Sequence, residues 1–122
     1  MTEKCFWKFL DGLLRQGRSC QVSGVIDSDE PGSRQAGRFI GGHALLPENY
    51  DKIDGDKIAG MGELLLRGKA ATRTKEAILI ILAHHPTRKA LNVLREYNRK
   101  PDEELKFFSR LALDECRMWN GL

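Results

Sequence analysis

The sequence of 122 residues contains few of the side chains that carry most metal and redox chemistry. It has three cysteines and three histidines. Cys5, Cys20 and Cys116 are far apart, and neither a CxxC pair nor the Cys/His spacing of a structural zinc site occurs. An odd number of isolated cysteines is typical of reduced thiols, so we expect a cytoplasmic protein without a disulfide framework. We expect Cys116 to pack as a small hydrophobic residue inside a helix.

Long hydrophobic runs are also missing. The longest apolar run, Ala77 to Ala83, is far shorter than the about 20 residues that a membrane-spanning helix needs. The N-terminal stretch carries Glu3 and Asp11 within its apolar residues, which does not fit a secretory signal. The sequence therefore predicts no contact with a membrane.

Short motifs of catalysis and nucleotide binding are absent as well. The segment GRFIGGHALL, residues 37–46, is rich in glycine but lacks both the GxGxxG order and the GK[ST] of a phosphate loop. The acidic segment DKIDGDK, residues 51–57, does not follow the calcium-loop pattern, and no serine lies in a GxSxG. We expect no metal and no cofactor, and favour a non-catalytic protein over an enzyme.

The apolar residues that are present recur mostly at helical spacing. Residues 1–17 predict a helix that Thr2 can cap and Gly17 can end. Its predicted apolar face consists of Phe6, Phe9, Leu10, Leu13 and Leu14. Residues 18–55 show no clear period, and we predict an irregular segment with a helical turn near Ala44 to Leu46.

Four further helices are predicted between residues 56 and 120. Asp56 caps the first, and the second begins near Thr72 or Thr74 and ends before Pro86. The continuous apolar run of the second also fits a buried strand, but the capping threonine and the helix-breaking proline favour a helix. The third runs from about Thr87 to Arg99, and Asp102 caps the fourth.

The apolar positions of these four helices repeat after 33 residues: Ile58 corresponds to Leu91, Met61 to Leu94 and Ile78 to Leu111. With the segments TKEAILIILAHHPTRKALNVL and PDEELKFFSRLALDEC, the sequence resembles the HEAT-like repeats, including those named after phycobilisome lyases. The resemblance implies an all-α fold of HEAT-like or armadillo-like helical hairpins. In a single domain, 1–122, residues 56–120 would form two repeats, 1–17 a capping helix and 18–55 an irregular segment.

Such repeats suggest a module that binds another protein, and the charge distribution suggests where. Residues 67–100 hold nine basic and two acidic side chains, whereas residues 27–56 hold seven acidic and three basic ones. The predicted contact surface consists of Arg67, Lys69, Arg73 and Lys75 in the connection between two helices, and of Arg88, Asn92, Arg95 and Arg99 on one face of the third predicted helix. The alternative is nucleic-acid binding through the same basic face, as in some proteins with HEAT-like surfaces, among them a class of DNA glycosylases.

Two further hypotheses concern the histidines and the C-terminal end. His84 and His85 precede Pro86, where they can cap the end of a helix. They are also the candidate polar site, and a small enzyme or metal-binding protein using His43, His84 or His85 is the second alternative function. Because two repeats leave an open end, Met118, Trp119 and Leu122 could contact a second copy of the chain.

Overall fold

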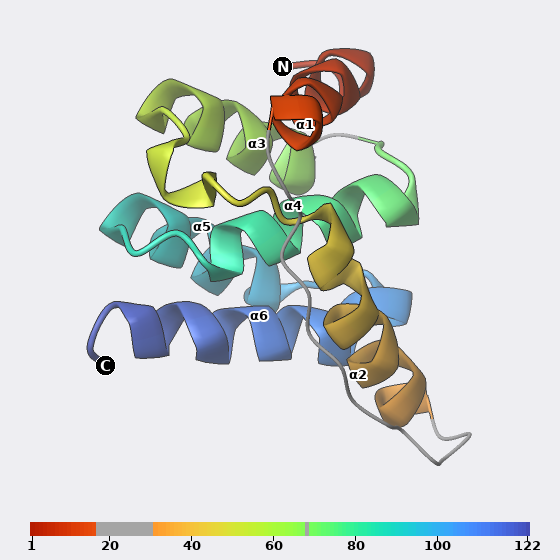
Figure 1. Cartoon of the computed structure of the whole chain (residues 1–122). Helices are drawn as coiled ribbons and strands as arrows, with labels where there is room; N and C mark the ends of the chain where they lie inside the picture. Colours follow the sequence, from red (N-terminus) through yellow and green to blue (C-terminus); the bar gives the residue numbers. More distant parts are fainter. Residues whose placement is uncertain (17–30, 68) are drawn as a thin grey trace.

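The computed structural model describes residues 1–16, 31–67 and 69–122 (Figure 1). Within these ranges the chain forms α-helices and short 3-10 helices and no strand, so the all-α class predicted from the sequence is confirmed. The α-helices are α1 (Glu3–Gln16), α2 (Pro31–Gly41), α3 (Gly55–Arg67), α4 (Thr72–Ala83), α5 (Arg88–Arg99) and α6 (Lys106–Trp119). The 3-10 helices are η1 (Gly42–Leu45), η2 (Tyr50–Lys52) and η3 (Glu103–Leu105). No helix among the described residues is both long enough and apolar enough to cross a bilayer.

Helix α4 lies at the centre of the molecule. Every side chain from Ala77 to Ala83 is buried, because α3, α5, α6 and η1 all pack against this helix. A helix covered on all sides needs apolar residues all round, which explains why its sequence shows a continuous run and no stripe. The prediction of a buried helix over this run is confirmed.

Among the helices from α3 onward, α3 packs against α5 and α4 against α6, and the consecutive helices α5 and α6 also pack on each other. Gly62 of α3 permits a close approach to α5, since a Cβ atom at this position would lie 2.8 Å from a methyl carbon of Val93. Helix α1 contributes Phe6 and Leu10 to the same core, as its predicted apolar face requires.

Several predicted helix ends are confirmed and three differ. The threonine predicted to cap α4 lies inside the helix, whose N-cap is Ala71 without a side-chain hydrogen bond. The Thr2 hydroxyl accepts from the amide of Cys5, and the Thr87 hydroxyl accepts from the amide of Ala90. The first turn of α3 is capped by Asp54, whose carboxylate accepts from the amide of Asp56 at 3.3 Å, so the predicted cap at Asp56 is wrong by two residues. The side chain of Asp102 makes no capping hydrogen bond, because other partners occupy its carboxylate.

The described part of the segment that we predicted to be irregular contains helix α2 followed by η1 and η2, so that prediction is wrong for α2 and η2. Gly17 and Cys20 lie outside the described residues. The reason for the error is tertiary: the Gln35 side chain of α2 accepts from the amides of Phe107 and Phe108, both at 2.8 Å. Gln35 thereby satisfies donors in the first turn of α6, a contact that no local pattern in residues 18–55 reveals. The predicted helical turn near Ala44 corresponds to η1.

Candidate metal centre

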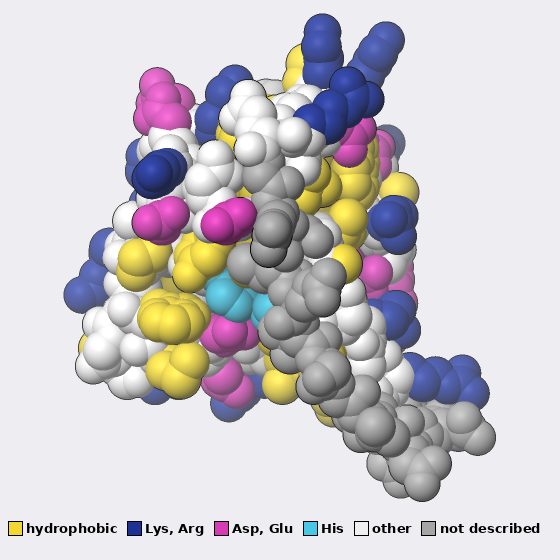
Figure 2. Space-filling view, viewed as in Figure 1, with side chains coloured by type: hydrophobic (Ala, Val, Ile, Leu, Met, Phe, Trp, Pro, Cys, Tyr) yellow, Lys and Arg dark blue, Asp and Glu magenta, His cyan; other side chains and the backbone are white. Residues whose placement is uncertain are grey.

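Three side chains from distant parts of the sequence converge at one end of α4. His43 lies in η1, His84 directly follows the last residue of α4, and Glu115 lies in α6. The Nε2 atoms of the two histidines are 3.1 Å apart, and His84 Nε2 is 2.7 Å from a carboxylate oxygen of Glu115. One nitrogen or oxygen atom from each residue lies within 4.8 Å of the other two. Figure 2 shows histidine side chains on this face, next to acidic and hydrophobic side chains.

The opposite nitrogen of each ring fixes its protonation. His43 Nδ1 is 2.8 Å from the carbonyl oxygen of Phe39, and His84 Nδ1 is 2.8 Å from that of Ile80. A carbonyl oxygen only accepts, so each Nδ1 must carry a hydrogen and donate it. Each neutral ring therefore directs the lone pair of Nε2 into the cluster.

The cluster thus brings together three electron-rich atoms. Two Nε2 atoms and one carboxylate oxygen meet there, and while both rings are neutral with Nδ1 protonated, neither Nε2 carries a hydrogen. Either a proton on Nε2 or a metal cation must compensate them. A cation satisfies all three atoms at once, whereas a single proton is shared among them.

The surroundings of the cluster shift the pKa values of His84 and Glu115 in opposite directions. The exposed fractions of His43 and His84 are 6% and 7%, and the side chain of Glu115 is 21% exposed. Burial lowers the pKa of His84, but hydrogen bonds with Glu115 and the Ile80 carbonyl outweigh it and leave that pKa above its ordinary value. For Glu115, burial raises the pKa, yet the hydrogen bond to His84 leaves it below the ordinary value. A carboxylate that stays ionised at the surface of the core is suited to bind a cation.

The donor set fits a transition metal. Two imidazoles and one carboxylate are typical ligands of Zn²⁺, with bonds of about 2.0–2.2 Å, and two nitrogens on a tetrahedral ion then lie about 3.3 Å apart. The 3.1 Å between the two Nε2 atoms is close to that spacing, whereas the 2.7 Å from His84 Nε2 to Glu115 is shorter, so the Glu115 carboxylate would move outward when an ion binds. The bonds from Nδ1 to backbone carbonyls are the usual outer contacts of metal-binding histidines, because they fix the tautomer and the ring orientation. Three protein ligands leave a coordination position for water or another molecule.

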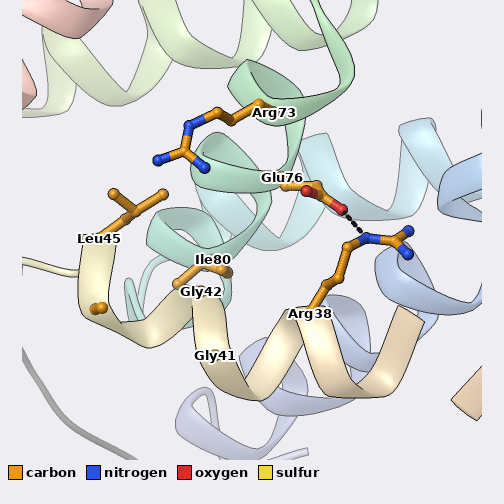
Figure 3. A pocket seen from close by; sticks show the side chains of 8 residues that line it. Arg38, Gly41, Gly42, Leu45, Arg73, Glu76 and Ile80 are labelled. Carbon is orange, nitrogen blue, oxygen red and sulfur yellow. Dashed lines mark hydrogen bonds and ion pairs between the residues drawn. The ribbon is translucent and has the colours of Figure 1, made fainter. Parts of the chain in front are cut away.

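The position of His43 depends on a glycine and an ion pair beside a neighbouring pocket of about 310 Å³ (Figure 3). A Cβ atom on Gly42 would lie 2.3 Å from Cδ1 of Ile80, so the glycine allows η1 to approach α4 closely. Arg38 pairs with Glu76 at 2.6 Å and holds α2 against α4 at the rim of the pocket. Together these contacts hold the backbone of η1, and with it His43, against the end of α4.

His85 does not belong to the cluster. Its Nε2 is 3.3 Å from the carbonyl oxygen of Ile53 and therefore donates. Its Nδ1 is 3.0 Å from the Thr87 hydroxyl, which leaves both ring nitrogens with protein partners. The second predicted histidine is thus a contact between the end of α4 and the segment before α3.

Cys116 follows Glu115 in α6 but has a different environment. Its thiol is 3.7 Å from the carbonyl oxygen of His85, and burial raises its pKa to about 11. A thiol that stays protonated is a poor metal ligand. The prediction that this cysteine packs as a small buried residue is confirmed.

The eight residues of the predicted contact surface do not share one environment. On α5, Arg88, Asn92, Arg95 and Arg99 are all exposed, as their spacing predicts. Arg67, however, belongs to α3, and Arg73 and Lys75 belong to α4, so only Lys69 lies in the connection. Arg73 lies 5.8 Å from the Trp7 ring, whereas Lys75 pairs with Asp102 at 2.8 Å. Arg73 therefore contacts an aromatic ring of α1, whereas Lys75 is neutralised by a carboxylate. The eight residues do not form one continuous surface of free cations.

Glu115 is the member of the cluster that sequence analysis missed. The shift of 33 residues that relates the helices places Glu115 opposite Leu82, which is fully buried. A carboxylate at a position whose counterpart belongs to the core breaks the hydrophobic pattern, and such breaks are common at functional sites. That mismatch was the available signal.

Comparisons with protein-family models, with curated proteins and with solved structures found no match to this chain.

Proposed function

We propose that this protein binds a divalent transition-metal ion of the Zn²⁺ type through Nε2 of His43, Nε2 of His84 and the carboxylate of Glu115. The observation that supports it is the convergence of three acceptor atoms whose histidines are both committed, through Nδ1, to backbone carbonyls. The remaining coordination position would take water or a small ligand.

Zinc titration of the metal-free protein tests this function. Trp119 follows Glu115 by four residues on α6 and so lies on the same side of the helix, where its fluorescence reports on the cluster. In a Trp7→Phe background that leaves Trp119 as the fluorophore, one equivalent of zinc should change the emission and reach saturation. Competition with a chromophoric chelator then gives the affinity.

Matched variants locate the site. Glu115→Gln keeps the size of the side chain but removes its charge, and we expect it to weaken zinc binding by at least tenfold. We expect the same of His43→Ala. The control is Asp114→Asn, because Asp114 is the neighbouring carboxylate on α6 and its side chain is 54% exposed. Equal zinc affinity in Glu115→Gln and Asp114→Asn would show that the cluster is not the site.

We also propose that the chain is a HEAT-like protein-interaction module. The support is the packing of α3 on α5 and of α4 on α6, together with three exposed apolar side chains at the C-terminal end. Met118 is 61% exposed, Trp119 49% and Leu122 59%. A photo-crosslinking residue at position 122 should capture one recurrent protein in cells, or a second copy of this chain. Capture of no protein, or only of a random set, would contradict the module.

A further inference from the structure

A hollow of about 400 Å³ lies where the end of α5 meets the beginning of α6. It is lined by Asn98, Arg99, Pro101, Lys106, Phe107 and Arg110. It is remote in sequence from His43 and His84, and its residues take no part in the metal centre. Its composition is unusual, because three cations surround one exposed aromatic ring and no carboxylate lines the hollow.

The cations are available to an external anion. Arg99 and Lys106 are exposed, and no carboxylate within residues 1–16, 31–67 and 69–122 forms an ion pair with either of them. Arg110 pairs with Asp114 at 3.4 Å, but both side chains are more than half exposed, and such surface pairs exchange partners at little cost. The hollow therefore presents a concentrated positive charge.

Phe107 is exposed yet held in a fixed place. Its exposed fraction is 48%, and its ring packs against Gly32, whose hypothetical Cβ atom would lie 3.5 Å from it. Its amide donates to the side chain of Gln35 at 2.8 Å. An aromatic ring that is about half exposed and packs on a neighbouring backbone is a platform for stacking, and it loses little conformational freedom when a planar group binds.

The positive surface extends from the hollow along α5. Arg99 is the last member of the exposed row that also contains Arg88, Asn92 and Arg95. This row spans the twelve residues of α5, or about 16 Å from first to last. Extended polyanions match such a row better than a single small anion does.

We propose that this surface binds single-stranded nucleic acid, with a base stacked on Phe107 and phosphates on Arg99, Lys106 and Arg110. The ring favours an unpaired base, because the bases of a duplex are already stacked on each other. Stacking combined with backbone contacts to cations is the usual mode of binding that depends little on sequence. Of the basic face of residues 67–100 that the sequence analysis predicted, Arg99 belongs to this binding surface. The proposed nucleic acid is single-stranded.

Fluorescence anisotropy with a labelled twelve-nucleotide oligo(dT), an oligo(U) of the same length and a matched duplex tests the proposal. The single strands should bind more tightly than the duplex, and affinity should fall steeply as salt rises. Phe107→Ala should weaken single-strand binding by about fivefold to 150-fold, whereas Phe107→Trp should retain it. Lys106→Gln should weaken binding of all single strands and reduce the salt slope by about 0.7.

The control is Trp119→Ala, which removes an exposed aromatic ring elsewhere on α6 and should leave oligonucleotide binding unchanged. Circular dichroism confirms that each variant is folded. Equal affinity of Phe107→Ala and wild type, or duplex binding as tight as single-strand binding, would overturn the stacking surface. Stronger binding to anionic lipid vesicles than to oligo(dT) would assign the cations to a membrane instead and would equally overturn it.

Discussion

Two polar clusters lie at opposite ends of α4, and they differ in how completely their hydrogen bonds are matched. At the N-terminal end, the carboxylate of Asp102 accepts from Lys75 at 2.8 Å and from the Tyr97 hydroxyl at 2.5 Å. Tyr97 also accepts from the amide of Asp102. Two donors meet one acceptor group, and the cluster is complete without any further species.

At the C-terminal end of α4, acceptors meet acceptors. The lone pairs of His43 and His84 point toward each other and toward Glu115, so the cluster needs a proton on Nε2 or a metal cation to match its acceptors. The comparison teaches that burial and short distances alone do not distinguish a structural contact from a binding site. The balance of donors and acceptors does.

The largest expected effect is the response of the two clusters to zinc. Zinc at a hundredfold excess over its dissociation constant should raise the free energy of unfolding of the wild type by about 2.7 kcal/mol. Thermal or urea unfolding with and without a chelator measures this gain. Asp102→Asn should keep the gain, and His84→Ala should lose it. If zinc still raised the free energy of unfolding of His84→Ala, the cluster at the C-terminal end of α4 would not be the zinc site.

The next effect concerns the glycine that lets η1 approach α4. Gly42→Ala places a methyl group against Ile80, and we expect a loss of about 1–3 kcal/mol in the free energy of unfolding. Because the clash displaces η1, zinc affinity should fall as well. Gly41→Ala is the matched control: a Cβ atom there meets nothing within 4 Å, and the backbone is helical. Urea unfolding should show this control to be unchanged or slightly stabilised.

A somewhat smaller loss is expected in the complete cluster. Asp102→Ala leaves Lys75 and the Tyr97 hydroxyl without their acceptor, which should cost about 1–2 kcal/mol in the free energy of unfolding. The loss should be the same with zinc and with a chelator. A loss that appears only in the presence of zinc would contradict the assignment of this cluster to structure alone.

The smallest effect is the pH dependence of the metal-free protein. The pKa of His84 is raised, so its contribution to stability is full below its ordinary value of 6.5 and is lost as pH rises through the raised value. Hydrogen bonds from Lys75 and Tyr97 lower the pKa of Asp102, so its contribution is present above 3.8 and is lost as pH falls through the lowered value. Urea unfolding between about pH 2 and pH 9 should therefore show that His84→Ala removes a loss of stability at alkaline pH and that Asp102→Asn removes a loss of stability at acid pH. If His84→Ala removed the acid loss and Asp102→Asn the alkaline loss, the cause given for each pKa shift would be wrong.

Much of the fold could be predicted from local patterns. The run from Ala77 to Ala83 was identified as a helix because a threonine precedes it and Pro86 follows it, and both boundaries are local. Helix α2 could not be predicted in this way. Among its described residues only Phe39 is a buried hydrophobic residue, and its support comes from Gln35 and Arg38, whose partners lie in α6, α4 and η3.

The candidate site was predictable only in parts. His43 and His84 were both named from the sequence, but their meeting depends on where α2 and η1 lie, and that placement is tertiary. His85 was given equal weight with His84, since both precede Pro86, yet the end of α4 turns the two rings toward different partners. Glu115 appeared as an ordinary residue of an amphipathic helix, and only its correspondence to Leu82 marks it.

The most direct test of the metal centre is anomalous diffraction at the zinc edge from crystals grown with one equivalent of zinc. We predict a peak at about 2.0–2.2 Å from His43 Nε2, His84 Nε2 and a carboxylate oxygen of Glu115. Anomalous peaks confined to other residues, with His43 and His84 still 3.1 Å apart around a proton, would contradict it.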